Sequence, residues 1–273
     1  MDVRRGAAGL LGSAHPGPSA AVTLLAAAYG ASVGLSAGRL TLVTSAVLAG
    51  QLSIGWSNDL IDRRRDAAVA RTDKPLALGD VSVATVRTAC AVAVVATVAL
   101  SLACGAVAGA VHLACVAAGW AYNLGVKSTP WSWLPFAVAF GGLPVFVTLA
   151  VPGAGLPSPS VPVAGALLGV GAHLVNVLPD LAEDAETGVR GLPHRLGERW
   201  TPVLAVLSLV TATGVLTLGL AAGSSSLPVW LLVSVPALVV ALAVVALLGH
   251  GRVPFRAAIG IAAVDVLLLV VAT

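Results

Sequence analysis

The sequence predicts an all-α, polytopic membrane protein with about nine transmembrane helices. Composition is the first reason: 58% of the 273 residues are hydrophobic, only 10% are charged, and the mean hydropathy is +0.98. A soluble domain averages about 25% charged residues. The second reason is a series of apolar runs of about 20 residues, the length that an α-helix needs to cross a bilayer. These features leave little room for a separate soluble domain.

Nine segments meet this length requirement, and short polar or Gly-Pro-Ser stretches separate most of them. The predicted spans are 19–37, 40–57, 82–104, 106–125, 132–151, 160–179, 201–222, 227–248 and 255–272. Residues 1–18 are polar and rich in glycine and proline, and we expect them to form a cytoplasmic N-terminal tail. Residues 19–272 are then a single nine-helix transmembrane domain.

The basic residues predict the orientation. Of the 15 Lys and Arg, 14 lie in the tail or in loops on one side of the predicted bilayer, and only Arg39 lies opposite. Cytoplasmic loops carry an excess of Lys and Arg. We therefore expect a cytoplasmic N-terminus and a C-terminus outside. The heavy use of Ala, Val, Gly and Arg suggests a GC-rich bacterial genome, so the expected location is a bacterial plasma membrane. The pI of about 9.1 reflects this topology, so the expected partner is the lipid bilayer and not nucleic acid.

The acidic residues are concentrated in a way that topology does not explain, because Asp and Glu contribute little to orientation. Ten of the 12 lie in two loops on the cytoplasmic side: Asp59, Asp62, Asp66, Asp73 and Asp80 in one, and Asp180, Glu183, Asp184, Glu186 and Glu198 in the other. In a helix, Asp59, Asp62 and Asp66 share one face. Clustered carboxylates repel each other by roughly 1 kcal/mol per pair in water. A hard divalent cation with oxygen ligands would explain the cluster.

The two acidic loops resemble each other. Asp59-Leu-Ile-Asp62 parallels Asp180-Leu-Ala-Glu183, and Pro75-Leu-Ala-Leu-Gly79 parallels Pro193-His-Arg-Leu-Gly197. Each motif ends an apolar span whose polar residues recur at helical spacing: Gln51, Asn58 and Asp62 in one, and His173, Asn176, Asp180 and Asp184 in the other. We interpret this as an internal pseudo-repeat that turns both motifs toward one site. A chance match of short segments is the alternative.

Two aspartate-rich helix ends suit a diphosphate held through Mg²⁺, which takes few carboxylates and keeps phosphate oxygens and waters as its other ligands. Such a site neutralises charge on a leaving diphosphate and would ionise an allylic carbon–oxygen bond. The apolar bundle would hold an isoprenoid tail and keep water from the carbocation. Basic residues that can hold phosphate oxygens surround the acids: Arg63, Arg64, Arg65, Arg71, Lys74, Lys127, Arg190 and Arg195.

Three segments together resemble the UbiA-type intramembrane prenyltransferases. The first reads Asn58-Asp59-x-x-Asp62-x-x-x-Asp66, then Arg71-x-x-Lys74-Pro75-Leu76 and Gly79, and looks like the first signature of that family. The second reads Asp180-x-x-x-Asp184, then Gly188, Leu192-Pro193 and Leu196-Gly197, and is similar to the second signature. Tyr122-Asn123-x-x-x-Lys127 resembles the segment between them. The resemblance covers about 20–272 and implies nine helices around a central cavity and Mg²⁺-dependent prenyl transfer.

Carried over by position, the resemblance implies site residues. The catalytic acids would be Asp59, Asp62, Asp180 and Asp184, and these with Asp66 would bind Mg²⁺. Diphosphate contacts are implied for Asn58, Arg71, Lys74, Lys127, Tyr122 and Asn176. One departure is Lys74, where the family more often has Arg, because an ammonium lacks the bidentate fork. The few rings that could stabilise a carbocation are Trp56, Trp120, Tyr122, Trp131, Trp133 and Phe136.

Several polar residues also have a structural interpretation. The arginines at 63–65 fit a topology anchor. His173 is either a hydrogen-bonding partner beside the ligand or a packing histidine. Asp265 lies inside the ninth span and is a functional candidate because ionisable groups within membranes are rare, although nothing in the sequence connects it to the loops. Solvated loop charges are expected at Asp73, Asp80, Glu186 and Glu198.

The predicted activity is transfer of a prenyl chain from an allylic (poly)prenyl diphosphate to a small hydrophobic, aromatic or quinone-precursor acceptor. A UbiA-type terpene cyclase is the alternative, with the same ionising site and an internal alkene in place of the acceptor. A transporter would place its carboxylates at the bilayer midplane, whereas these lie at helix ends. A CDP-alcohol phosphotransferase would carry an Asp-Gly-x-x-Ala-Arg run, which this sequence lacks.

Overall fold

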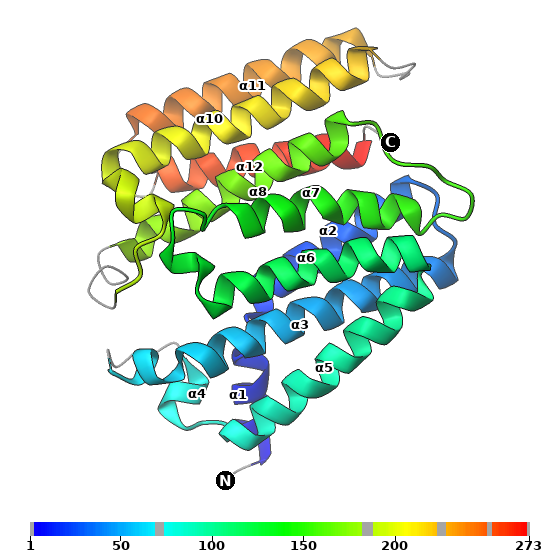
Figure 1. Cartoon of the computed structure of the whole chain (residues 1–273). Helices are drawn as coiled ribbons and strands as arrows, with labels where there is room; N and C mark the ends of the chain where they lie inside the picture. The colour runs from blue at the N-terminus through cyan, green and yellow to red at the C-terminus, as the bar shows by residue number, and fades with distance from the viewer. Residues whose placement is uncertain (1–2, 69–73, 182–187, 223–227, 250–252, 272–273) are drawn as a thin grey trace.

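The computed structural model describes residues 3–68, 74–181, 188–222, 228–249 and 253–271, and every regular element in these ranges is helical (Figure 1). The longer helices are α2 (Pro16–Ser32), α3 (Ala37–Ala68), α5 (Val83–Ala103), α6 (Ala106–Leu124), α7 (Leu134–Leu149), α8 (Ser160–Val177), α10 (Leu192–Ala222), α11 (Val229–Leu248) and α12 (Val253–Val271). The shorter ones are α1 (Val3–Gly12), α4 (Pro75–Leu78), η1 (Val126–Ser128) and η2 (Leu178–Asp180). The all-α prediction is confirmed.

Each of the nine predicted spans coincides with one of the longer helices. Among the described residues, six of these helices are long and apolar enough to cross a membrane, namely α3, α5, α6, α8, α10 and α11. The chain is therefore a multi-pass membrane protein. Crossing by α2, α7 and α12, and with it the total of nine spans, stays a prediction.

The helices lie side by side, and most of them contribute to one large apolar core. α3 packs against α2, α5 and α6, and α8 packs against α7 and α10 (Figure 1). Phe146, Leu209 and Ile261, from three different helices, are completely buried in this core. Where α7 and α8 meet, a Cβ on Gly165 or Gly169 would collide with the α7 backbone. Small residues let membrane helices approach closely, which favours their packing where lipid offers no hydrophobic driving force.

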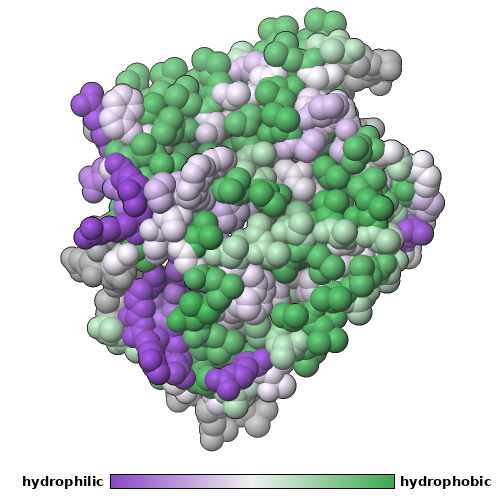
Figure 2. Space-filling view, in the orientation of Figure 1, coloured by the Kyte–Doolittle hydropathy of each residue, from purple (hydrophilic) through white to green (hydrophobic). Residues whose placement is uncertain are grey.

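The segments that carry the predicted motifs lie at one end of this bundle. α3 ends there at Ala68 and α8 at Val177, and α4 and η1 lie at the same end, on the left of Figure 1. Figure 2 shows hydrophilic residues gathered at this end, with hydrophobic residues over most of the rest of the visible face. The mostly exposed connection between α7 and α8, residues 150–159, lies at the opposite end. The sequence prediction that this motif end is cytoplasmic has no test in the structure.

The N-terminal segment is more ordered than the predicted tail of residues 1–18. Its described part forms α1 and the start of α2, and α1 packs against α4. The Trp56 indole Nε1 donates a hydrogen bond to the Leu10 carbonyl at 2.9 Å. Pro16 and Pro18 lie in the first turn of α2. Backbone N–H groups in the first turn of a helix have no acceptor within the helix, so proline costs no hydrogen bond there. Glycine and proline therefore mark helix boundaries here, and the division into tail and domain stays a prediction.

The two Pro-x-x-Leu-Gly segments of the pseudo-repeat have related conformations. Pro75 begins α4, which ends at Gly79 with φ 79°. Pro193 is the second residue of α10, which is broken at Gly197 with φ 74°. Glycine takes positive φ without a Cβ penalty, so each segment is a short helical stretch that ends or breaks at a glycine with positive φ. The two glycines differ in ψ, which is 11° at Gly79 and 178° at Gly197, so the pseudo-repeat stays a prediction.

Candidate active site

The first motif is helical throughout, as its spacing predicts. α3 continues past the predicted span to Ala68, so Asp59, Asp62 and Asp66 lie on one face. All three are buried, with 2%, 6% and 5% of their surface exposed. Buried carboxylates need hydrogen-bonding or charged partners, and the structure shows which groups pair with Asp62 and Asp59.

Asp62 is held by three groups, one from η1 and two from its own helix α3. Lys127 of η1 donates to Asp62 Oδ1 at 2.6 Å, and the Asn58 amide and Arg65 Nη2 each donate to Oδ2 at 3.2 Å. Burial lowers the pKa of the Lys127 ammonium from its ordinary value, and the Asp62 carboxylate offsets part of that shift. The structure thus brings Lys127 to the first motif, and its predicted contact with a diphosphate stays a prediction.

Asp59 has a different pair of partners. The Lys74 ammonium donates to Asp59 Oδ1 at 2.8 Å and lies 3.4 Å from Asn58 Oδ1. His15 Nε2 lies 3.0 Å from the same Asp59 oxygen. The other carboxylate oxygen, Oδ2, is buried and has no hydrogen-bond partner within the described residues. Asp59 thus keeps one oxygen uncommitted beside two cationic or polar groups.

Asn123 fastens α6 to the motif helix. Its amide nitrogen donates to the Ile54 carbonyl at 2.9 Å and to Ser57 Oγ at 2.8 Å. Its amide oxygen accepts from Asn58 at 3.2 Å. Asn123 and Lys127 therefore act from one end of α6 on neighbouring turns of α3. Asn123 lies within a sequence motif that gives no indication of this role, and nothing in the sequence pattern pointed to His15.

Tyr122, the neighbour of Asn123 in sequence, belongs to a cluster of rings with Phe136 and His173. The Tyr122 ring meets Phe136 edge-on with centroids 5.2 Å apart, and Phe136 lies 4.8 Å from His173. His173 is 1% exposed, and its Nε2 lies 3.0 Å from Ser132 Oγ, which also accepts from the Leu192 N–H. His173 is thus packed into a link between α8, the segment before α7, and the start of α10. Trp131, by contrast, is largely exposed.

The second motif is only partly visible. Asp180 closes η2, but its side chain lies outside the described residues, as do Arg71, Asp73, Glu183, Asp184 and Glu186. Asn176 is described and is exposed near the end of α8. Asp80 and Glu198 are exposed, as solvated loop charges should be. The convergence of both motifs on one site therefore stays a prediction, although both helix ends lie at the same end of the bundle.

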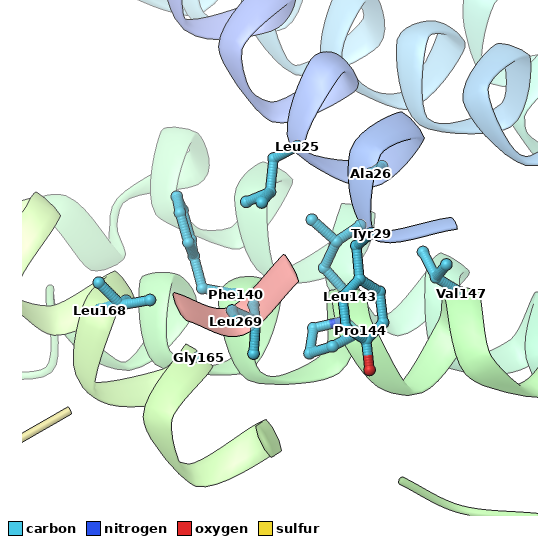
Figure 3. Close-up of a pocket in the computed structure, with 10 residues that line it drawn as sticks. All are labelled: Leu25, Ala26, Tyr29, Phe140, Leu143, Pro144, Val147, Gly165, Leu168 and Leu269. Atoms are coloured by element: carbon cyan, nitrogen blue, oxygen red, sulfur yellow. The ribbon is translucent and has the colours of Figure 1, made fainter. Parts of the chain in front are cut away.

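Two spaces between helices bear on where an apolar substrate could lie. A cavity of about 570 Å³ lies beside η2, with a lining that includes Pro179, Pro202 and Arg256. A second, apolar pocket is lined by residues of α2, α7, α8 and α12, among them Tyr29 and Phe140 (Figure 3). Its free volume of about 10 Å³ holds roughly one water. A prenyl tail would enter this second pocket only if the helices shifted.

Asp265 has a partner that the sequence could not reveal. It is completely buried, and Thr213 of α10 donates a hydrogen bond to its Oδ1. Its Oδ2 is without a partner in the described part of the chain. No contact among the described residues joins Asp265 to the motif acids. The structure therefore assigns it to the packing of α12 on α10.

A family comparison agrees with this arrangement. The UbiA prenyltransferase family matches residues 19–262. The chain belongs to this family. The bacteriochlorophyll synthase 33 kDa chain of Cereibacter sphaeroides is 36% identical to the UbiA-family protein described here over 181 residues, or 61% of this chain. The match spans 58% of that relative's length, which is less than two thirds of it.

Solved structures share the UbiA fold at low sequence identity. A digeranylgeranylglyceryl phosphate synthase superposes with a TM-score of 0.73 at 15% identity, covering 98% of each chain. A UbiA homolog from Archaeoglobus fulgidus bound to GPP and Mg²⁺ gives 0.73 at 16% identity, covering 97% of this chain and 98% of that one. These similarities confirm the all-helical membrane fold.

The first motif of this UbiA-family chain fits Mg²⁺ bound together with a diphosphate. No three metal-ligating side chains converge on one point among the residues described. Mg²⁺, however, is usually held by one or two carboxylates plus substrate phosphates and waters. Asp59 offers a buried oxygen that has no partner among the described residues, and Lys74 and Lys127 carry ammonium groups that could bind phosphate oxygens. The donor set suits a metal that arrives with an anionic substrate.

Proposed function

We propose that the protein is a Mg²⁺-dependent membrane prenyltransferase, which transfers an isoprenoid chain from an allylic prenyl diphosphate to a small hydrophobic acceptor. One observation carries the proposal: Asp59 and Asp62 are buried at the end of an apolar bundle, each paired with a lysine from outside their own helix α3. Family membership, the similarity to a bacteriochlorophyll synthase chain, and the shared fold with a homolog bound to GPP and Mg²⁺ support it.

In this proposal the carboxylates would hold Mg²⁺, with Asp59 and Asp62 supplying the first motif's oxygens and Asp66, Asp180 and Asp184 the further candidates. Bound Mg²⁺ would neutralise charge on the leaving diphosphate. Lys74 and Lys127 would turn from their carboxylates toward phosphate oxygens, which a compact ammonium can follow. Arg71, Asn58 and Asn176 remain proposed diphosphate contacts.

The chemistry follows from that placement. The allylic carbon–oxygen bond breaks, and its electron pair leaves with the diphosphate. An acceptor carbon then supplies the pair for the new carbon–carbon bond, and a base removes the proton from that carbon. The apolar bundle excludes water, which would otherwise quench the carbocation. The faces of Tyr122 and Phe136, beside Asn123, are candidates to stabilise the positive charge.

The acceptor is proposed more broadly than the donor. Aromatic and quinone-precursor molecules suit electrophilic substitution, and the similarity to a bacteriochlorophyll synthase chain adds tetrapyrrole pigments to those worth testing. The cavity beside η2 is large enough, at about 570 Å³, for a drug-sized molecule. We propose it as the region where the acceptor approaches.

The test is product mass spectrometry with the purified protein in detergent. Prenyl diphosphates of several lengths are combined with phenolic, quinone-precursor and tetrapyrrole acceptors, with Mg²⁺ or with EDTA. We expect a prenylated acceptor and free diphosphate that both disappear with EDTA and return with Mg²⁺. Release of a cyclic hydrocarbon without acceptor modification would assign a terpene cyclase instead. Undiminished turnover in a metal-free preparation would contradict the proposed site.

A further inference from the structure

His15 joins the N-terminal segment to the first acidic motif. Its Nε2 lies 3.0 Å from Asp59 Oδ1 and 3.0 Å from the Lys74 ammonium, which itself donates to that carboxylate oxygen at 2.8 Å. The three groups form a closed triangle. His15 precedes the 19–262 range that matches the family and lies 44 residues before Asp59 in sequence. Neither the motif spacing nor the family match assigns it a role.

The backbone conformation at His15 would favour glycine, which indicates that the imidazole side chain accounts for a histidine at this position. His15 has φ 51° and ψ 62°, and it is the one non-glycine residue with positive φ in the described ranges. This left-handed conformation is unfavourable for a residue with a Cβ, and glycine would take it without strain. Strained residues persist where the surroundings fix them, and they cluster at functional sites.

The surroundings do fix this turn. Ala14 is completely buried, and its carbonyl accepts a hydrogen bond from Ser19 Oγ at 2.9 Å. The same carbonyl rests against Gly55 of α3, where any Cβ would collide with it. Gly55 lies one helical turn before Asp59. The N-terminal segment is therefore seated on the motif helix itself, at the point from which the imidazole reaches the carboxylate.

A single imidazole nitrogen, Nε2, faces both a hydrogen-bond donor, the Lys74 ammonium, and an acceptor, the Asp59 carboxylate. With a hydrogen on Nε2, it donates to Asp59; without one, it accepts from Lys74. A neutral imidazole can do either, because its hydrogen can sit on either ring nitrogen. His15 can thus hold whichever of its two neighbours is not engaged by a ligand.

We propose that His15 is a positioning residue of the diphosphate site, which keeps Asp59 and Lys74 at the spacing that a metal–diphosphate complex requires. The proposal rests on the proposed function. The His15 side chain is 37% exposed, whereas those of Asp59 and Lys74 are 2% and 12% exposed. His15 therefore forms the outer edge of the site. Partners that orient metal ligands typically affect metal affinity or activity by 10–100-fold.

Three substitutions separate this role from a purely structural one. His15→Ala removes the ring. His15→Asn keeps a residue that tolerates the left-handed conformation but shortens the polar reach. His15→Gln restores the reach with an amide that donates and accepts at once. Leu11→Ala, at an exposed side chain of the same segment, is the matched control, and thermal unfolding in detergent monitors folding.

Two measurements apply to every variant: kcat and KM for the prenyl diphosphate, and Mn²⁺ binding by electron paramagnetic resonance with inorganic diphosphate present. We expect His15→Ala and His15→Asn to weaken Mn²⁺ binding and to lower kcat/KM by about 10–100-fold, with unfolding temperatures near that of the parent. His15→Gln should recover most of both, and Leu11→Ala should match the parent. Unchanged Mn²⁺ binding in His15→Ala would overturn the proposal. Equal losses in all three His15 variants, tracking lower unfolding temperatures, would also overturn it.

The outcomes distinguish this inference from the proposed function. If the parent protein transfers no prenyl group with any acceptor, the proposed function fails, and the Mn²⁺ measurement still decides whether His15 organises the carboxylates. If the parent is active and His15→Ala equals it in KM, kcat and Mn²⁺ binding, only the role of His15 fails.

Discussion

Lys127 and Asp62, 65 residues apart in the chain, form an ion pair in which the ammonium nitrogen lies 2.6 Å from a carboxylate oxygen. The two side chains are only 10% and 7% exposed. The pair ties η1, at the end of α6, to the motif helix α3. Both groups are buried, so each charge compensates the other. Removal of either side chain would leave the remaining charge without this countercharge.

The first prediction concerns the stability of this pair. Lys127→Met leaves the buried Asp62 carboxylate with only its Asn58 and Arg65 contacts, and Asp62→Asn leaves the buried Lys127 ammonium without this countercharge. Breaking a buried pair typically destabilises by up to about 3–5 kcal/mol. The double variant Asp62→Asn/Lys127→Met should lose much less than the sum of the two. Thermal unfolding of the four proteins in one detergent measures the cycle. Strictly additive losses would show that the two residues do not interact.

The second prediction concerns catalysis at the first motif. Asp62→Asn keeps the side-chain shape but removes a charge from the proposed metal site, and loss of an electrostatic contact of this kind costs about 10²–10³ in rate. Asp80→Asn is the matched control, because Asp80 is exposed beyond α4. Single-turnover prenyl transfer measures both. Equal impairment of the two variants would contradict the assignment of Asp62.

The third prediction tests the second motif. We expect Asp180→Asn to lose about 10²–10³ in rate as well, since the pseudo-repeat places Asp180 in the position that corresponds to Asp59. Glu198→Gln, at an exposed residue after the Gly197 break, should be near parental. Near-full activity of Asp180→Asn in the same single-turnover assay would remove the second motif from the site.

The fourth prediction treats Asp265 as a packing residue. Asp265→Asn can still accept from Thr213, so it should be close to the parent in stability and activity. Asp265→Ala loses that interhelical hydrogen bond, which is worth about 0.6–2 kcal/mol within a membrane protein. The expected result is a lower unfolding temperature with an unchanged kcat. A large loss of kcat in a stable Asp265→Asn protein would make Asp265 a functional group.

The fifth prediction concerns orientation. Ser158, in the connection between α7 and α8, and Asp80, just after α4, are both exposed. These two segments lie at opposite ends of the bundle (Figure 1), and the basic residues predict that the end with α4 is cytoplasmic. In intact cells, an impermeant maleimide should label Ser158→Cys, whereas Asp80→Cys should react only after permeabilisation. The three native cysteines are buried, which keeps the background low. The reverse labelling pattern would invert the topology.

Much of the fold follows from the sequence because apolar run length is a local property. Each of the longer helices falls on a predicted span, and the register of Asp59, Asp62 and Asp66 follows from helical periodicity alone. Helix ends were less predictable: the membrane span was expected to end at residue 57, and the helix that carries it, α3, continues through the acidic motif to Ala68. Ion pairs along its last turns, such as Arg65 with Asp62, let a charged segment stay helical.

Site residues could be predicted from the sequence only where they belong to a recognisable motif. Lys127 could be connected to the first motif by resemblance, but the pairing of Asp59 with Lys74 depends on how α4 folds back on α3. His15 left no signal, because a lone histidine in a Gly/Pro-rich segment has no periodic pattern. The Thr213–Asp265 contact is likewise a consequence of how α10 meets α12, which spacing within either helix does not specify.

The exposed connection at 150–159 gives the chain a natural point of division. The segment before it carries Asp59, Asp62 and Lys127, and the segment after it carries Asp180. The two would have to recognise each other mainly through the close-packed α7–α8 interface with its glycine contacts. Exposed loops of this kind tolerate interruption. Two co-expressed fragments cut there would act as a split enzyme, in which catalysis reports the association of the halves within the bilayer.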